Sequence, residues 1–203
     1  MTSNELGLRE RKRLATRRAI QVAALELVDE RGLSRVTVDE ISAQADVSPR
    51  TFFNYFATKE QAVLGDPPVP PSGAPVDAFV QGGSGQLLPD VRDLMSAVWR
   101  AAELDADLTF LRQRVVKRYP ELLGQRIATM REFELEIAGV VAQRLEHDDP
   151  QQDPDTTIRR ARLVTLVSMA AMRTAWQSWS GGDLEELHAL VDQSFADLHT
   201  VLA

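Results

Sequence analysis

The chain has 203 residues with 44% apolar content, which suits one large domain or a small domain joined to a larger one, with a substantial core. It has no cysteine, so disulfide frameworks and thiolate metal sites are excluded, and a cytoplasmic location is expected. The N-terminus lacks the apolar stretch of a signal peptide, and no window approaches about 18 uncharged apolar residues, so no membrane association is predicted.

Charge is distributed unevenly along the chain. The net charge is −7, yet residues 1–60 hold 10 Lys and Arg against 9 Asp and Glu. The basic residues gather in the segment 9–18, which forms a local basic patch on an acidic protein. Such a pattern favours a small N-terminal domain that meets an anion and a larger body that does not, although a solvated helix end gives the same charges.

The first two helices are predicted from periodicity and capping signals. Residues 10–31 carry apolar residues at helical spacing, and Gly32 ends this helix. The sequence T-V-D-E then begins a second, short helix with a capping box, in which Thr37 accepts from an N–H group and Glu40 reaches back.

Two further short helices follow. Ser48 is a good N-cap and Pro49 is preset for the first helical position, so a third helix is expected over residues 49–56. Thr58 caps a fourth helix that has Lys59 in its first turn. A helix of about two turns, a short turn and another short helix form a helix-turn-helix pattern.

Residues 52–56 read F-F-N-Y-F, and four aromatic residues in five positions cannot all face inward from one helix. Phe52 and Phe56 are four residues apart and are predicted to share the inner face, whereas Phe53 and Tyr55 lie partly outward. The outer surface then offers groups that bind base edges and phosphate oxygens. The alternative is a helical domain whose aromatic ridge packs on a neighbour.

The remainder of the chain divides into a connector and a helical body. Residues 65–90 are rich in Pro and Gly, so an irregular linker is predicted there rather than a regular helix. Helices are expected over 90–104, 107–118, 120–146, 156–179 and 184–202, and no strand pattern of real length is present. The acidic loop at 146–155 does not have the spacing of an EF-hand.

Residues 17–64 resemble the N-terminal DNA-binding domain of TetR-family transcriptional regulators. The resemblance rests on R-x-I-x-x-A-A-x-x-L-V-x-E-x-G at 18–32, T-V-D-E-I-S at 37–42 and V-S-P-R-T-F-F-N-Y-F-A-T-K-E at 47–60. It implies an all-α fold, with a helix-turn-helix DNA-binding domain at 1–64, a connector at 65–90 and a larger helical ligand-binding and dimerisation domain at 91–203. It also implies a homodimer on a pseudo-palindromic DNA operator, and a repressor that a small-molecule effector releases.

The resemblance also assigns residues to the DNA. The helix at 49–56 would enter the major groove with Pro49, Arg50 and Asn54 nearest the bases, and the basic segment would add backbone or minor-groove contacts. The full set of expected DNA-binding residues is Arg17, Thr37, Pro49, Arg50, Thr51, Phe53, Asn54, Tyr55 and Lys59. Lys59 is expected to meet a phosphate at a helix N-terminus.

Two residues depart from the family pattern. The position of Phe53 is usually Tyr, so one hydrogen bond to a phosphate is expected to be lost. Asp46 stands where the family usually has Gly in the turn. Asp tolerates a left-handed backbone better than most residues, so the turn is expected to survive.

The last two helices are the expected dimer surface. The segment from Leu163 to Met172 is apolar nearly all round, and the final helix carries an apolar stripe from Leu184 to Leu202. Family members pair these helices with those of a second copy, and the alternative is a monomer core. The expected ligand-binding residues are Trp99, Phe110, Arg114, Tyr119, Phe133, Met169, Met172, Arg173 and Trp176. A buried Arg173 needs an anion, such as Glu103, Glu134 or an acidic ligand.

Two other readings stay open at this point. A regulator of the same family without an effector would act through a protein partner or through DNA alone. An enzyme would need a catalytic constellation, but the three histidines are dispersed, and G-x-S-x-G and H-E-x-x-H motifs are absent. No catalytic residue, metal site or cofactor is therefore predicted.

Overall fold

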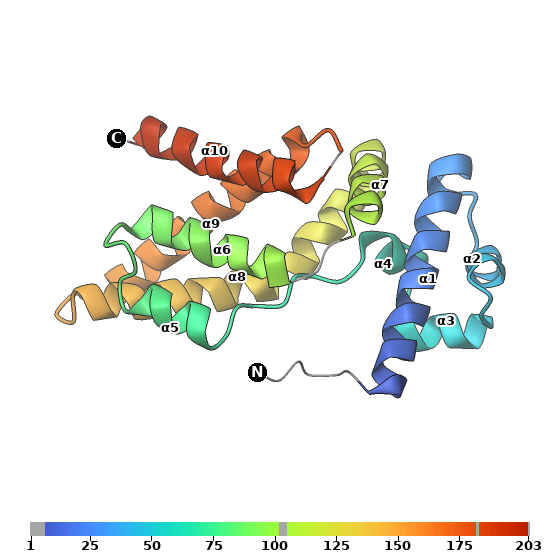
Figure 1. The fold of residues 1–203 in the computed structure, drawn as a ribbon, viewed down its shortest axis with the longest axis horizontal. Helices are drawn as coiled ribbons and strands as arrows, with labels where there is room; N and C mark the ends of the chain where they lie inside the picture. Colours follow the sequence, from blue (N-terminus) through green and yellow to red (C-terminus); the bar gives the residue numbers. More distant parts are fainter. Residues whose placement is uncertain (1–6, 102–104, 182, 203) are drawn as a thin grey trace. The chain divides into compact units, whose positions relative to one another are not determined.

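The computed structural model describes residues 7–101, 105–181 and 183–202, and it forms two compact units (Figure 1). The first unit comprises the chain up to Asp66 together with Leu111–Gly124, and the second comprises Pro67–Phe110 and Gln125–Ala203. Throughout the described residues the regular structure is helical, as predicted for an all-α protein. None of the helices in these ranges is long and apolar enough to cross a membrane.

Four helices from the start of the chain build the first unit together with residues 111–124, and the helix starts follow the predicted capping signals. They are α1 (Leu8–Arg31), α2 (Val38–Gln44), α3 (Pro49–Tyr55) and α4 (Lys59–Leu64). Helix α1 packs on α2 and α4, and α2 packs on α3. The side chains of Thr37, Ser48 and Thr58 each accept a backbone N–H at the start of the next helix, so all three predicted caps are confirmed.

The turn between α2 and α3 depends on Asp46. Asp46 has φ +53°, and among the described residues it is the one non-glycine with a positive φ. The left-handed backbone expected at this position is therefore present, and Asp is one of the few residues with a side chain that tolerates it.

The segment Leu111–Gly124 belongs to the first unit. Arg112 donates from Nε to the backbone O of Val63 at 3.1 Å and from Nη2 to Oε1 of Gln21 at 3.2 Å. Arg118 donates to the backbone O of Asp29 at 3.0 Å. These bonds attach the segment to α1 and α4.

The second unit packs helices α5 (Ala74–Val80), α6 (Leu87–Ala101), α9 (Pro154–Ser178) and α10 (Leu184–Leu202) around one core. Helices α7 (Ala106–Arg118) and α8 (Pro120–Asp148) contribute residues to both units. The prediction of an irregular segment throughout 65–90 is wrong, because α5 forms inside it. Pro75 occupies the first turn of α5, where its missing N–H has no partner to lose, and Phe79 is buried.

A buried ion pair joins the connector, α6 and α8. Arg144, which is 2% exposed, donates to the carboxylate of Asp90 at 3.0 Å and to the backbone O of Phe79 at 2.8 Å. Asp90 also accepts from the backbone N–H of Ser84 at 2.8 Å. Burial raises the pKa of Asp90, but the hydrogen bonds from Ser84 and Arg144 outweigh it and hold this pKa below the ordinary 3.8.

We expect Asp90→Asn to destabilise the protein by about 1–3 kcal/mol, because Arg144 loses one of its two carboxylate partners and keeps the partly exposed Asp148, at 2.7 Å. Asp93→Asn is the matched control. Its carboxylate is exposed and pairs with Arg92, so its loss should cost less than about 1 kcal/mol. Chemical denaturation at pH 7 measures both values, and equal effects of the two variants would contradict the assignment.

The lowered pKa of Asp90 also determines the direction in which the folding stability changes with pH. The contribution of the Asp90 carboxylate is complete above its unfolded pKa and is lost as the pH falls through the lower folded value. The stability difference between wild type and Asp90→Asn should therefore shrink below about pH 4.

Candidate nucleic-acid interface

Helix α3 has one buried face and one open face. Phe52 is fully buried and Phe56 is 3% exposed, and their ring centroids are 6.0 Å apart. Phe53 is 56% exposed and Tyr55 is half-buried. The prediction that two of the four aromatic residues face inward and two lie partly outward is confirmed.

Arg50 and Asn54 lie on the side of α3 opposite the buried rings. At about 100° per residue, Arg50 and Asn54 are adjacent, and Phe53 lies beside Arg50 at one edge of the same surface. Pro49, Arg50, Phe53 and Asn54 are all exposed. The helix therefore presents a guanidinium, an amide and an apolar ring together on its open surface.

Two threonines in the set have local bonding roles. The hydroxyl of Thr51 lies 2.8 Å from the hydroxyl of Ser48. The Thr37 hydroxyl and backbone N–H both donate to the Glu40 carboxylate at 2.9 Å, and these bonds lower the pKa of Glu40. Both threonines thus fix the starts of helices that frame the α3 surface.

Lys59 is held at the start of α4 by two carbonyl groups. Its Nζ donates to the backbone O of Leu33 at 2.7 Å and to that of Val36 at 2.8 Å. The ammonium has three N–H donors, so one of them is not used by these bonds. Lys59 therefore ties α4 to the turn between α1 and α2, a role that the sequence did not suggest.

Arg17 also has internal partners. It is paired with the carboxylate of Asp66, it donates to the backbone O of Tyr55 at 3.0 Å, and its guanidinium carbon lies 4.2 Å from the centroid of the Phe56 ring. Arg17 thus braces the end of α3 against α1. Asp66 was missed by sequence reasoning, because its partner lies 49 residues away and no local pattern connects them.

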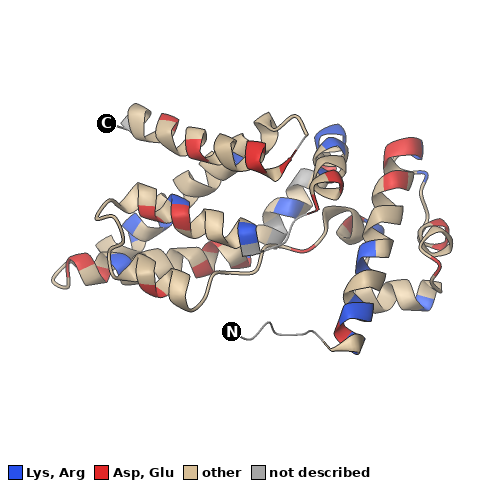
Figure 2. Ribbon diagram, viewed as in Figure 1, with Lys and Arg blue, Asp and Glu red and all other residues tan. Residues whose placement is uncertain are grey.

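The predicted basic segment forms the first turns of α1 (Figure 2). Arg9, Arg11 and Lys12 are exposed there, and Arg13 pairs with Glu10 at 2.7 Å. This part of α1 therefore presents several cations to solvent, although one of them is partly neutralised within the helix.

The expected ligand-binding residues are only partly brought together. Phe133 and Met172 are buried in the core of the second unit, and Trp99 and Met169 pack against that core. Phe110 packs edge-on against Trp179 in the same unit, with ring centroids 5.9 Å apart. Trp176 is half-buried on α9.

Three of the expected ligand-binding residues have other surroundings. Arg114 pairs with Asp29 in the first unit. Tyr119 lies in the same unit, where its hydroxyl lies 3.3 Å from the position that a Cβ on Gly32 would occupy. Arg173 is exposed on α9, so the prediction of a buried arginine is wrong, and solvent meets its charge. Its suggested partner Glu103 lies outside the described residues.

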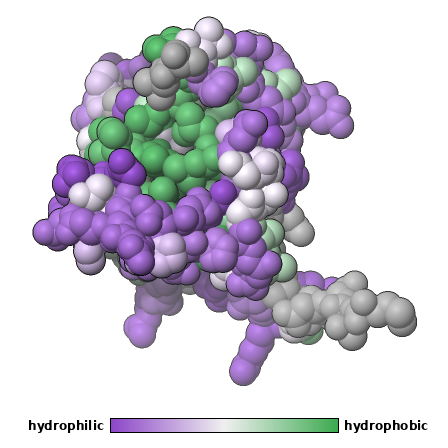
Figure 3. Space-filling model, turned by 90° about the vertical axis from the view of Figure 1, so that its left-hand side faces the viewer, coloured by the Kyte–Doolittle hydropathy of each residue, from purple (hydrophilic) through white to green (hydrophobic). Residues whose placement is uncertain are grey.

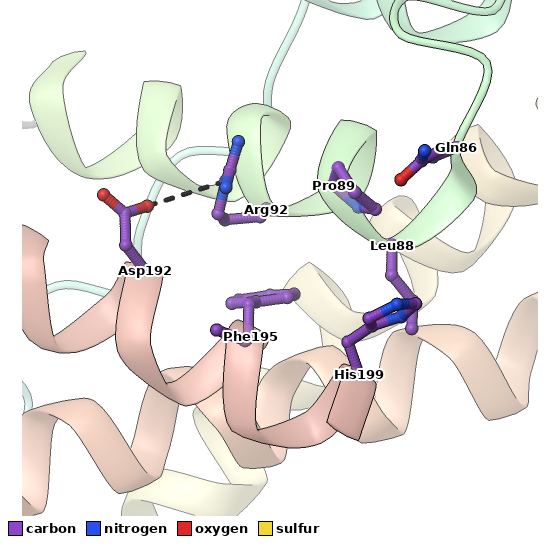
Figure 4. Close-up of a pocket in the computed structure, with 8 residues that line it drawn as sticks. Gln86, Leu88, Pro89, Arg92, Asp192, Phe195 and His199 are labelled. Atoms are coloured by element: carbon purple, nitrogen blue, oxygen red, sulfur yellow. Dashed lines mark ion pairs between the residues drawn. The ribbon is translucent and has the colours of Figure 1, made fainter. Parts of the chain in front are cut away.

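Two hollows of the described residues lie elsewhere in the second unit. One, of about 150 Å³, lies between the first turns of α6 and the last turns of α10 (Figure 4). Phe195 and Leu88 contribute apolar walls, and Arg92 and Asp192 form an ion pair of 3.5 Å at its rim. The other, of about 320 Å³, lies beside Phe79 and Asp90. Neither is lined by an expected ligand-binding residue. One face of the molecule also shows a hollow surrounded by apolar side chains (Figure 3).

Comparison with known proteins finds two family models along the chain. Residues 20–64 match the family model described as bacterial regulatory proteins, tetR family, and residues 86–203 match the model described as the MftR C-terminal domain. The chain is 30% identical over 215 aligned residues to the HTH-type transcriptional regulator TcmR of Streptomyces glaucescens, covering 99% of this chain and 90% of that protein.

Similar solved structures are also regulators. A putative TetR-family transcriptional regulator from Mesorhizobium loti shares 17% identity over 93% of this chain and 96% of its own, with a TM-score of 0.44. The TetR-family transcriptional repressor FadR of Thermus thermophilus, solved with lauroyl-CoA, shares 22% identity over 90% and 92% of the two chains, with a TM-score of 0.36. From the two family models and the full-length relative, the chain belongs to the TetR family of transcriptional regulators, which act by binding DNA.

Proposed function

We propose that the protein is a dimeric repressor, that α3 contacts the bases of a pseudo-palindromic operator, and that a small-molecule effector releases it from the DNA. The observation that carries the DNA-binding part is the open surface of α3, where Arg50 and Asn54 are exposed side by side. Arg pairs well with guanine and Asn with adenine in the major groove. The rigid attachment of α3 by Phe52 and Phe56 supports the same role, because base contacts need a fixed helix.

The remaining expected contacts are with phosphates. Thr37, Thr51, Tyr55 and Lys59 flank the open surface of α3, and their polar groups suit backbone oxygens. The two carbonyl bonds of Lys59 hold its ammonium at the N-terminus of α4, where its third donor and the helix dipole favour an anion. Arg17 would contribute mainly by holding α3 in place.

We expect Arg50→Ala to weaken specific binding by about 1–3 kcal/mol and to relax the preference at one position of each half-site. Lys59→Met should weaken binding to all duplexes and make the slope of log K against log salt shallower by about one. It should also lower the melting temperature, because two carbonyl groups lose their donor. Fluorescence anisotropy with a duplex from the protein's own promoter region measures the binding.

Arg131→Ala is the control for lost charge, because Arg131 is an exposed arginine in the second unit. It should leave both binding and salt dependence unchanged. If Lys59→Met lowers stability but leaves the salt slope unchanged, Lys59 only stabilises the fold through its two carbonyl bonds and does not contact a phosphate. Unchanged sequence preference in Arg50→Ala would remove α3 as the base-contacting helix.

The proposed dimer surface is the outer face of α9 with the adjoining face of α10. Ile158, Leu163 and Leu166 are 61%, 62% and 45% exposed on α9. The stripe on α10 has a different role, because Leu187 and Val191 are buried inside the protomer; the side chain of Leu202 lies outside the described part. A second copy would cover the exposed leucines and remove their apolar surface from water.

Charge on the two helices supports pairing with a second copy. The exposed basic residues on α9 are Arg159, Arg160, Arg162 and Arg173, and the exposed acidic residues on α10 are Glu185, Glu186, Asp192 and Asp197. In a two-fold dimer the same patch faces itself with its helices exchanged, so the α9 of one protomer can meet the α10 of the other. Opposite charges would then select this arrangement.

The double variant Leu163→Asp with Leu166→Asp should be monomeric, because four carboxylates would be buried at the two-fold contact. Leu135→Asp is the matched control, since Leu135 is an exposed leucine on α8, at 61%. Sedimentation velocity measures the mass. A dimer in the double variant, or a monomer in the control, would reject the assigned surface.

The effector site is proposed for the apolar core of the second unit. Trp99 and Met169 are half-buried at the edge of a core that includes Phe133 and Met172, and large flexible or aromatic side chains suit a small apolar ligand. A regulator without an effector is the second candidate, and one observation favours it: neither of the two hollows described above is lined by the expected ligand-binding residues.

A panel of small apolar acids, esters and aromatic compounds distinguishes the two candidates. Under the first, a compound at 100 times its Kd should stabilise the free protein by about 2.7 kcal/mol and weaken its affinity for DNA. Thermal melting and anisotropy of the DNA complex measure these effects. Met172→Arg should abolish both responses. If every stabilising compound leaves DNA binding unchanged, the second candidate is preferred.

A further inference from the structure

Phe53 has an unusual position among the aromatic residues of this protein. All twelve Phe, Trp and Tyr side chains lie in the described ranges, and Phe53 is the only one of them that is exposed. Its ring packs edge-on against Phe52, with centroids 5.5 Å apart and planes at 85°. Because Phe52 is fully buried, the exposed ring of Phe53 rests on a fixed neighbour and is oriented before any partner arrives.

The chemistry of this ring does not suit a phosphate. A phenyl group has no donor, and the negative charge above its face repels an anion. A phenyl ring gains instead from apolar contact that removes its surface from water. We therefore expect Phe53 to contact an apolar group that lies beside the groups contacted by Arg50 and Asn54.

The geometry of α3 restricts where that partner lies. Arg50, Phe53 and Asn54 fall within about one helical turn, a rise of about 6 Å, which corresponds to about two successive base pairs. In the major groove, the apolar group on the base edges is the C5-methyl of thymine. An apolar ring next to a guanidinium and an amide can contact that methyl while its neighbours bind the donors and acceptors of adjacent bases.

We propose that Phe53 contacts the C5-methyl group of a thymine in each half-site of the operator and so helps to determine which sequence the protein binds. The inference rests on the proposed entry of α3 into the major groove. It gives Phe53 a base-contacting role in place of the phosphate contact that the usual tyrosine makes.

Replacement of thymine by deoxyuridine tests this role, because it removes the methyl group and nothing else. The probe is a duplex selected by the wild-type protein from a random pool, with each thymine replaced in turn in both half-sites. At one symmetric position we expect a loss of about fourfold per methyl, or about 15-fold for the pair. Phe53→Ala should bind the thymine duplex more weakly and lose no further affinity with deoxyuridine.

Two further variants make the result specific. Phe53→Leu keeps an apolar side chain and should retain most of the preference for thymine. Leu8→Ala removes a comparable exposed apolar side chain, 63% exposed on α1, and should leave that preference unchanged. Circular dichroism of Phe53→Ala checks that α3 is intact.

The outcomes separate this inference from the proposed function. If Phe53→Ala weakens the thymine and deoxyuridine duplexes equally, the ring packs on the sugar–phosphate backbone and the inference is wrong, while DNA binding by α3 stands. If Phe53→Ala binds like wild type, the ring has no role on DNA. If the wild-type protein selects no duplex at all, the proposed function fails as well.

Discussion

The burial of Phe52 and Phe56 is the constraint on which the DNA-binding unit depends. Once these two rings enter the core, the helical period places Arg50 and Asn54 on the opposite side of α3 and Phe53 and Tyr55 on its flanks, where Phe53 is exposed. The same contact orients the exposed Phe53 ring through its edge-on packing against Phe52. The buried rings and the open surface proposed to contact DNA are therefore two consequences of one seven-residue helix.

Several cationic side chains of the first unit form hydrogen bonds within the fold, in addition to any contact that they make with a bound anion. Lys59 bonds two carbonyl groups in the turn before α2, and Arg17 bonds Asp66 and the end of α3. Each of these side chains thus helps to hold α3 at a fixed orientation. Base contacts need such rigidity, because a displacement of about 1 Å is enough to lose a hydrogen bond.

The second unit combines an apolar core with one buried ion pair. Arg144 and Asp90 connect α8 to the start of α6, and the backbone O of Phe79 at the end of α5 completes the site. A buried charge that has specific partners fixes one arrangement of these elements, since any other leaves a charge without compensation. The outer face of α9 keeps Leu163 and Leu166 in solvent instead, and this is the surface proposed to be covered by a second copy.

The sequence alone determined the features that depend on neighbours within a few residues. The helix caps at Thr37, Ser48 and Thr58 and the inward and outward aromatic residues of α3 follow from local spacing, and the family was indicated by resemblance of residues 17–64 to known sequences. Even the left-handed turn at Asp46 was open to prediction, because it needs only a residue that tolerates a positive φ. The extent of the long helices was also close to that predicted, since periodicity accumulates along the chain.

Only the tertiary structure decided what long-range contacts control. Three contacts join residues far apart in sequence: the pairing of Arg17 with Asp66, the attachment of residues 111–124 to α1, and the pairing of Arg144 with Asp90. The prediction that Arg173 is buried was wrong, because the sequence of an apolar helix does not show which side meets solvent. The formation of α5 within a Pro-rich segment depended on burial of Phe79. In each case the deciding free energy comes from packing or pairing between distant segments, which local propensity does not contain.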